Sequence, residues 1–204
     1  MKYSSNRPKT IFFVGNSMYD KDGTNVFGRN YVPINTHLAL TASGKNVGYN
    51  CYAVSGRTTT QLLADMPTKV IPYLRVGDIV VFTEMTNEIG TGNSVLNTYN
   101  LLLQCRDLVW NIGAKFVLQG AIACNGASPA GYANITTQLQ SLNTYFRNTP
   151  SLVDGFADPG SLSQCDTDSD CANTTNFNTD GIHPKNTLYD LIYPLTVTAI
   201  ISLL

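Results

Sequence analysis

The tripeptide Gly-Asn-Ser occurs twice in the sequence, ending at Ser17 and at Ser94. A serine hydroxyl becomes a good nucleophile only when a neighbouring base removes its proton. Ser17 follows the apolar run 11–14 and Gly15, and glycine permits the sharp turn that such a position needs. Ser94 stands directly before a helical pattern, where serine is favoured as an N-terminal cap. The pattern favours Ser17 as the nucleophile, although Ser17 taken alone is also typical of a polar turn.

A base for Ser17 must come from one of only two histidines. His37 lies beside leucines in an expected helix, which indicates a packed or surface histidine. His183 follows Asp180 by three residues, a spacing that lets the carboxylate reach one ring nitrogen while the other faces a nucleophile. Pro184 suits the first turn of a helix, so His183 is expected at a defined corner. The sequence therefore predicts a catalytic triad of Ser17, His183 and Asp180.

A serine nucleophile also needs hydrogen-bond donors for the negative oxygen that forms during attack. Gly56 follows the second expected strand and can offer its backbone N–H group. Asn87 follows the third expected strand and can offer its side-chain amide. Ligands bind at the carboxyl ends of parallel strands. We therefore predict an oxyanion hole formed by the backbone N–H groups of Ser17 and Gly56 and the amide of Asn87.

The elements that must position these residues follow from hydrophobic periodicity. Strand patterns cover residues 9–14, 46–54, 78–83, 115–122 and 152–157, and helical patterns cover 33–43, 58–74, 94–112, 131–148 and a last segment from about Pro184. Continuous apolar strands that alternate with amphipathic helices predict a parallel sheet of about five strands, covered on both faces. No repeat or linker divides the chain, so residues 1–204 are predicted to form a single domain. The stretch 158–182 is irregular, and a loop of that length is usually functional or disordered.

The composition excludes some partners. The chain has 204 residues, a formal net charge of −1 and only 13% charged residues, without a basic cluster that would indicate nucleic acid or an anionic membrane surface. The apolar stretch 188–204 is short for a membrane span and has helical spacing, so we expect it to pack on the core. A polar, weakly charged surface favours an extracellular, surface or virion-associated location, although the first ten residues show no signal peptide. The oligomeric state stays open.

One polar loop offers two further interpretations. Cys165 and Cys171 bracket it and could form a local disulfide, which the sequence leaves open. Asp166, Asp168 and Asp170 stand at alternate positions, as in the first half of a calcium loop, but the following glycine and the distal glutamate are missing. A solvated acidic loop is favoured. Patterns for phosphate loops, dinucleotide binding and the α/β-hydrolase elbow are absent, so no metal or organic cofactor is expected.

These blocks together resemble the motifs of the SGNH/GDSL hydrolase superfamily, in the same order and over nearly the whole chain. The four named residues of the superfamily would be Ser17, Gly56, Asn87 and His183. The resemblance implies a flavodoxin-like, three-layer α/β/α fold, which agrees with the pattern of strands and helices.

The chain departs from the superfamily pattern at three positions. Asn16 stands where an aspartate is usual, and Met85 and Glu88 replace the usual glycine and aspartate of the third block. These changes bear on substrate fit and rate more than on the type of reaction, because all four named positions are filled.

The predicted function is that of a serine esterase acting on a small-molecule or glycan ester through an acyl-enzyme. A short acyl group, with acetyl favoured, on a carbohydrate suits the polar surface and the many carbohydrate esterases of the superfamily. One alternative is a lipid esterase or thioesterase of the same fold. Another is a glycan-binding module that keeps the fold without hydrolysis.

Overall fold

The computed structural model describes residues 7–19, 31–126 and 130–204. Within them, all five strands run parallel in one sheet of order β2-β1-β3-β4-β5. The strands are β1 (Lys9–Gly15), β2 (Val47–Ala53), β3 (Ile79–Thr83), β4 (Lys115–Gln119) and β5 (Gly155–Ala157). The strand order reverses between β1 and β3, and ligands bind at the carboxyl ends of strands on either side of such a reversal.

The central strands are apolar on both faces because helices cover both sides of the sheet. Ile11 and Phe13 of β1 belong to the core on one side, whereas Phe12 and Val14 belong to the core on the other. All residues of β3 are buried, while the edge strand β2 is largely half-buried or exposed. Alternate side chains of β1 therefore pack into two separate hydrophobic cores, one on each face of the sheet.

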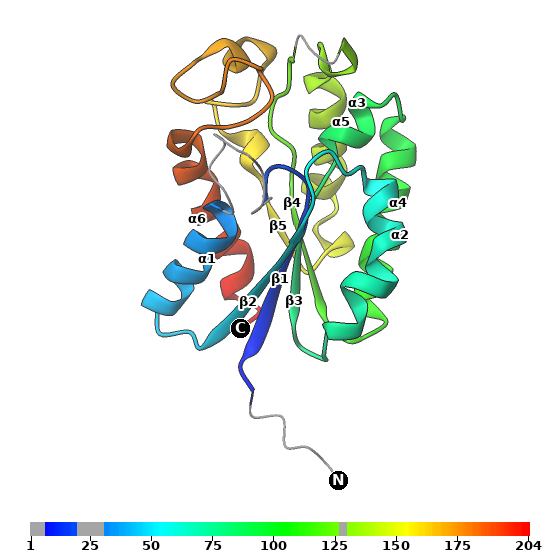
Figure 1. Cartoon of the computed structure of the whole chain (residues 1–204), viewed down its shortest axis with the longest axis vertical. Helices are drawn as coiled ribbons and strands as arrows, with labels where there is room; N and C mark the ends of the chain where they lie inside the picture. Colours follow the sequence, from blue (N-terminus) through cyan, green and yellow to red (C-terminus); the bar gives the residue numbers. More distant parts are fainter. Residues whose placement is uncertain (1–6, 20–30, 127–129) are drawn as a thin grey trace.

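The helices form two outer layers (Figure 1). One layer contains α1 (Tyr31–Ala42) and α6 (Asn186–Ile201), and the other contains α2 (Thr59–Lys69), α4 (Val95–Trp110) and α5 (Thr136–Asn148). A short helix, α3 (Thr86–Gly90), follows β3 directly and was not predicted from the sequence. The three-layer α/β/α arrangement confirms the expected fold class.

Several boundaries differ from the expectation for local reasons. The helix expected over 58–74 ends at Lys69, and the 3-10 helix η1 (Ile71–Tyr73) follows it. The helix expected from 131 begins at Thr136 instead. The φ of Asn134 is +57°, a left-handed conformation that a right-handed helix does not contain.

The long stretch 158–182 contains only the short 3-10 helices η4 (Pro159–Ser161) and η5 (Asp168–Ala172). Cys165 and Cys171 are buried thiols rather than a disulfide, and their sulfur atoms contact the backbone carbonyls of Pro159 and Thr167. In the described part of the chain, no helix has both the length and the apolar character needed to span a bilayer.

Candidate active site

The turn after β1 presents Ser17 at the carboxyl edge of the sheet. Gly15 lies beside Thr83 of β3, and a Cβ atom on Gly15 would lie 2.6 Å from the Thr83 carbonyl oxygen. Only glycine permits this close approach of the two strands. The backbone N–H of Met18 donates to the side-chain oxygen of Asn16 over 2.9 Å, a local turn of the kind that asparagine favours. Ser17 is thus held between these two residues.

Ser17, His183 and Asp180 form one hydrogen-bonded chain. The Ser17 Oγ atom lies 2.8 Å from Nε2 of His183, and Nδ1 of His183 lies 2.7 Å from Oδ2 of Asp180. The other carboxylate oxygen of Asp180 accepts the backbone N–H groups of Ile182 and His183 over 2.9 and 3.0 Å. Asp180 therefore fixes both the imidazole ring and the backbone that carries it.

Asp180 stays ionised at neutral pH. Burial raises the pKa of this carboxyl, but hydrogen bonds from the His183 ring and from the N–H groups of His183 and Ile182 outweigh burial and lower the pKa to about 2. A charged carboxylate stabilises the imidazolium that forms when the ring takes up a proton. The three side chains can therefore move a proton away from the Ser17 hydroxyl.

The segment before α6 holds His183 in place. The backbone N–H and the side-chain nitrogen of Asn178 both donate to the His183 carbonyl oxygen, over 2.9 and 3.0 Å. Gly181 has a φ of +67°, and a Cβ atom there would lie 2.7 Å from the carbonyl oxygen of Asn125. The two hydrogen bonds from Asn178 and the left-handed backbone conformation of Gly181 together fix the corner that carries His183.

The two expected oxyanion donors follow β2 and β3, the strands on either side of β1, and they are linked to each other. Gly56 has a φ of +76°, and no heavy atom of the described residues lies within 4 Å of a Cβ position there. The side-chain nitrogen of Asn87 donates over 2.8 Å to the carbonyl oxygen of Arg57, the residue after Gly56. The side-chain oxygen of Asn87 accepts the hydroxyl of Tyr132 over 2.8 Å. A carboxamide nitrogen carries two hydrogens, so Asn87 can offer its second N–H to a ligand.

Glu84 lies buried beside the turn of Ser17 and was not singled out from the sequence. It is 1% exposed, and its carboxyl accepts the side-chain N–H of Asn16 and, over 2.9 Å, the backbone N–H of Glu88. Burial raises the pKa of Glu84 to about 8 in spite of these hydrogen bonds. This pairing explains why asparagine occupies position 16, since an aspartate would place a second carboxyl against Glu84. The available signal was a glutamate directly after an apolar strand in a chain with few charges.

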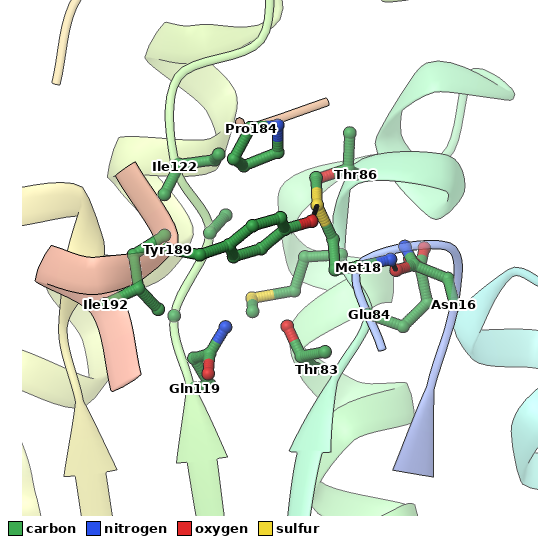
Figure 2. A pocket seen from close by; sticks show the side chains of 13 residues that line it. Asn16, Met18, Thr83, Glu84, Thr86, Gln119, Ile122, Pro184, Tyr189 and Ile192 are labelled. Atoms are coloured by element: carbon green, nitrogen blue, oxygen red, sulfur yellow. Dashed lines mark hydrogen bonds between the residues drawn. The ribbon is translucent and has the colours of Figure 1, made fainter. Parts of the chain in front are cut away.

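A pocket lies next to the turn that carries Ser17 (Figure 2). It lies among the carboxyl ends of β1, β3 and β4 and the start of α6. Asn16 and Met18, on either side of Ser17, line it together with Pro184, which follows His183. Its empty space, open mouth included, is about 350 Å³, and most of this is open to solvent. The enclosed part has room for only a few atoms of a ligand.

The other residues weighed from the sequence lie outside this arrangement. The Ser94 hydroxyl accepts the N–H of Asn97 over 3.1 Å and caps α4, as predicted. His37 packs against Tyr49 with the ring centroids 4.9 Å apart, so it is a packed histidine, as predicted.

Asp170 of the acidic loop forms its hydrogen bonds locally. Asp170 accepts the backbone N–H of Thr167 over 2.9 Å and the Thr167 hydroxyl over 2.7 Å. Asp180, a few residues further on, is engaged with His183 as described above. Within the described residues, no group of three His, Cys, Asp or Glu side chains is placed to hold a metal ion.

No known family profile matches this chain, and no curated protein matches it in sequence. Solved structures do resemble it. A carbohydrate acetylesterase family member from Sinorhizobium meliloti is 18% identical with a TM-score of 0.73, over 96% of this chain and 98% of that one. A GDSL-like lipase from Bacteroides thetaiotaomicron is 19% identical with a TM-score of 0.70, over 96% and 89%. The acetylxylan esterase Axe2 from Geobacillus stearothermophilus is 12% identical with a TM-score of 0.69, over 95% and 94%. The chain therefore has the fold of the SGNH/GDSL hydrolases, as its motifs implied.

Proposed function

We propose that this chain is a serine ester hydrolase of the SGNH type. Ser17 is the nucleophile, His183 the general base and acid, and Asp180 the group that orients the histidine. The observation that carries the proposal is the hydrogen-bonded chain from the Ser17 hydroxyl through His183 to Asp180, at the carboxyl edge of the sheet. The fold shared with esterases and lipases supports the same conclusion.

The reaction proceeds in two halves. Nε2 of His183 takes the proton of Ser17 as the Ser17 oxygen attacks the ester carbonyl carbon, and the carbonyl electron pair moves to oxygen. When this tetrahedral intermediate collapses, the bond to the alcohol breaks and His183 returns the proton to the leaving alcohol. Water, deprotonated by His183, then attacks the acyl carbon on Ser17 to form a second tetrahedral intermediate. Its collapse breaks the bond to the Ser17 oxygen, His183 returns the proton to that oxygen, and the carboxylic acid leaves.

The negative oxygen of each intermediate needs donors on the side away from His183. We propose that the backbone N–H groups of Ser17 and Gly56 and the second side-chain N–H of Asn87 supply them. Asn87 is already held at both ends of its amide by Arg57 and Tyr132, so its remaining N–H is oriented before the substrate arrives. Removing one such donor typically lowers kcat roughly 10²- to 10³-fold.

We infer that the acyl group is short, with acetyl on a carbohydrate as the favoured substrate. The chain carries few charges, and two of the similar structures are described as a carbohydrate acetylesterase family member and an acetylxylan esterase. A lipid esterase or thioesterase needs an apolar groove for a long chain, whereas the lining of the pocket includes the polar residues Thr83, Glu84 and Gln119. Comparing turnover of p-nitrophenyl acetate and octanoate tests this point, since a strong preference for octanoate would favour a lipid esterase.

Labelling with a fluorophosphonate and mapping of the modified residue test the reaction type. We expect the label on Ser17, and we expect Ser17→Ala to abolish both labelling and turnover. Ser94→Ala is the matched control, because Ser94 ends the same tripeptide but caps a helix, and this variant should still be labelled. A label on another residue contradicts the proposal. Unchanged glycan binding by Ser17→Ala, with no ester turnover by either form, would instead indicate a glycan-binding module.

A further inference from the structure

The floor of the pocket beside Ser17 contains an amide nitrogen without a partner. Gln119 ends β4 and is only 4% exposed. Its side-chain oxygen accepts the hydroxyls of Tyr19 and Thr196 over 2.7 and 3.0 Å. This arrangement turns the nitrogen toward the pocket, as Figure 2 shows. The nitrogen donates to no described residue and is therefore available to a ligand in the pocket.

A second polar group faces the same space. Thr83 is the last residue of β3, is 5% exposed, and follows four apolar residues. Its hydroxyl points toward the pocket in Figure 2 and makes no hydrogen bond to the described residues. Valine has nearly the same volume as threonine and lacks the hydroxyl. The fold alone therefore gives no reason for a threonine at this position.

A third polar group has only a weak partner. Tyr189 in α6 is 1% exposed, and its hydroxyl lies 3.8 Å from the sulfur of Met18, which is a weak acceptor. The remaining walls are mainly apolar and include Met18, Met85, Ile122 and Ile192. An apolar wall with hydrogen-bonding groups at its floor matches a short carbon chain that carries an oxygen at its far end.

We propose that this pocket is the acyl subsite and that, among short acyl groups one atom longer than acetyl, it prefers one bearing a hydroxyl, of the 2-hydroxyacyl class, such as glycoloyl. The substrate hydroxyl accepts a hydrogen bond from the Gln119 amide and shares one with the Thr83 hydroxyl. The carbonyl oxygen of the ester occupies the oxyanion site, and the leaving alcohol faces His183. The substituent on the acyl carbon is then the group that remains to enter the pocket. This inference rests on the proposed function, since it takes Ser17 as the nucleophile.

Isosteric esters test the inference directly, because glycoloyl and propionyl differ only in a hydroxyl against a methyl group. We would measure kcat/KM for the p-nitrophenyl esters of glycolic, propionic and acetic acid, each divided by its rate constant with hydroxide to remove intrinsic reactivity. The wild-type protein should prefer glycoloyl over propionyl by about tenfold. Thr83→Val should lower this ratio about three- to tenfold, the worth of one neutral hydrogen bond, and Thr83→Ser should restore it.

Thr98→Val is the matched control, since Thr98 is a buried threonine of α4 that does not line the pocket. It should leave the glycoloyl-to-propionyl ratio unchanged. Equal preference for the two esters, or a ratio that Thr83→Val does not change, overturns the inference while the esterase function stands. If no ester is turned over and Ser17 is not labelled by a fluorophosphonate, the proposed function fails and this inference fails with it.

Discussion

The Tyr132 hydroxyl donates to the side-chain oxygen of Asn87, while the nitrogen of the same amide donates to the Arg57 carbonyl, each over 2.8 Å. The two bonds hold the amide from opposite ends. The Tyr132 ring also packs closely on α3, because a Cβ atom on Gly90 would lie 2.8 Å from it. Tyr132 therefore supports the proposed oxyanion site by positioning the Asn87 amide.

Tyr132→Phe tests this positioning role. The ring packing is kept and one hydrogen bond is lost, so we expect kcat to fall about three- to tenfold while KM stays unchanged. Steady-state kinetics with a short-chain ester provide the measurement. Tyr145→Phe, on the exposed side of α5, is the control and should leave both constants unchanged. A rise in KM with constant kcat would show that Tyr132 acts on binding instead.

Asp180→Asn should lower kcat by about 10⁴-fold. It should also lower the free energy of unfolding at neutral pH, because the Asp180 carboxylate accepts the backbone N–H groups of Ile182 and His183 as well as the ring. The amide is similar in shape to the carboxylate but cannot stabilise an imidazolium in the same way. Asp190→Asn, in α6, serves as the control because Asp190 bonds only the Tyr31 hydroxyl among the described contacts. Activity of Asp180→Asn close to that of the wild type would remove Asp180 from the mechanism.

Glu84 should make the protein less stable as the pH rises. Its pKa is about 8 in the folded state against 4.5 for an unperturbed glutamate, so between these values the folded state holds a proton that the unfolded state has lost. The free energy of unfolding should therefore be highest near the lower value and fall toward the upper one, by up to about 1.4 kcal/mol per pH unit. Urea unfolding at several pH values would measure the slope. Glu84→Gln cannot titrate, and an identical slope in this variant would assign the effect to other groups.

The pairing of Asn16 with Glu84 can be tested by exchanging the amide and the carboxyl group between the two positions. Asn16→Asp places two carboxyl groups in contact and should cost about 1–3 kcal/mol of stability at a pH above the Glu84 pKa of about 8, where the two groups no longer share a proton. Combining it with Glu84→Gln lets the new amide donate to the new carboxylate, so the double variant should recover most of the loss. The free energies of unfolding of the four proteins form a double-mutant cycle. Additive effects would show that the two side chains do not interact.

Gly15→Ala should destabilise the junction of β1 and β3. The added Cβ atom would lie 2.6 Å from the Thr83 carbonyl oxygen and 2.9 Å from its methyl carbon, and both belong to a packed strand. We expect a loss of about 1–3 kcal/mol in the free energy of unfolding. Gly48→Ala in β2 is the control, since its nearest atom would be 3.4 Å away. Similar small effects of the two substitutions would contradict a tight strand contact at Gly15.

The sheet could be predicted because its central strands contain continuous apolar runs, 11–14 in β1 and 79–82 in β3. The apolar run 79–82 lies between the polar residues Asp78 and Thr83, and such a continuous run indicates a strand that is buried on both faces. The short helix α3 lacks the length for a periodic signal and was missed. The start of α5 was placed too early because the backbone conformation of Asn134 is not encoded in hydrophobicity.

The grouping of Ser17 with Asp180 and His183 was accessible from the sequence because it depends on strand ends and on a local spacing of three residues. The structure brings these side chains into hydrogen-bond contact. The roles of Tyr132 and Gln119 were not accessible in the same way. Each acts through a rotamer and through partners dozens of positions away, and neither leaves a pattern in the chain.

Ser17 and His183 are 166 positions apart, and one hydrogen bond joins them. A contact of such sequence separation requires closure of a very long loop, which costs entropy and slows its formation. Turnover should then return only after α6 has docked against the finished sheet. If the protein is refolded from urea in the presence of a chromogenic ester, the lag before product appears would time the last step of assembly.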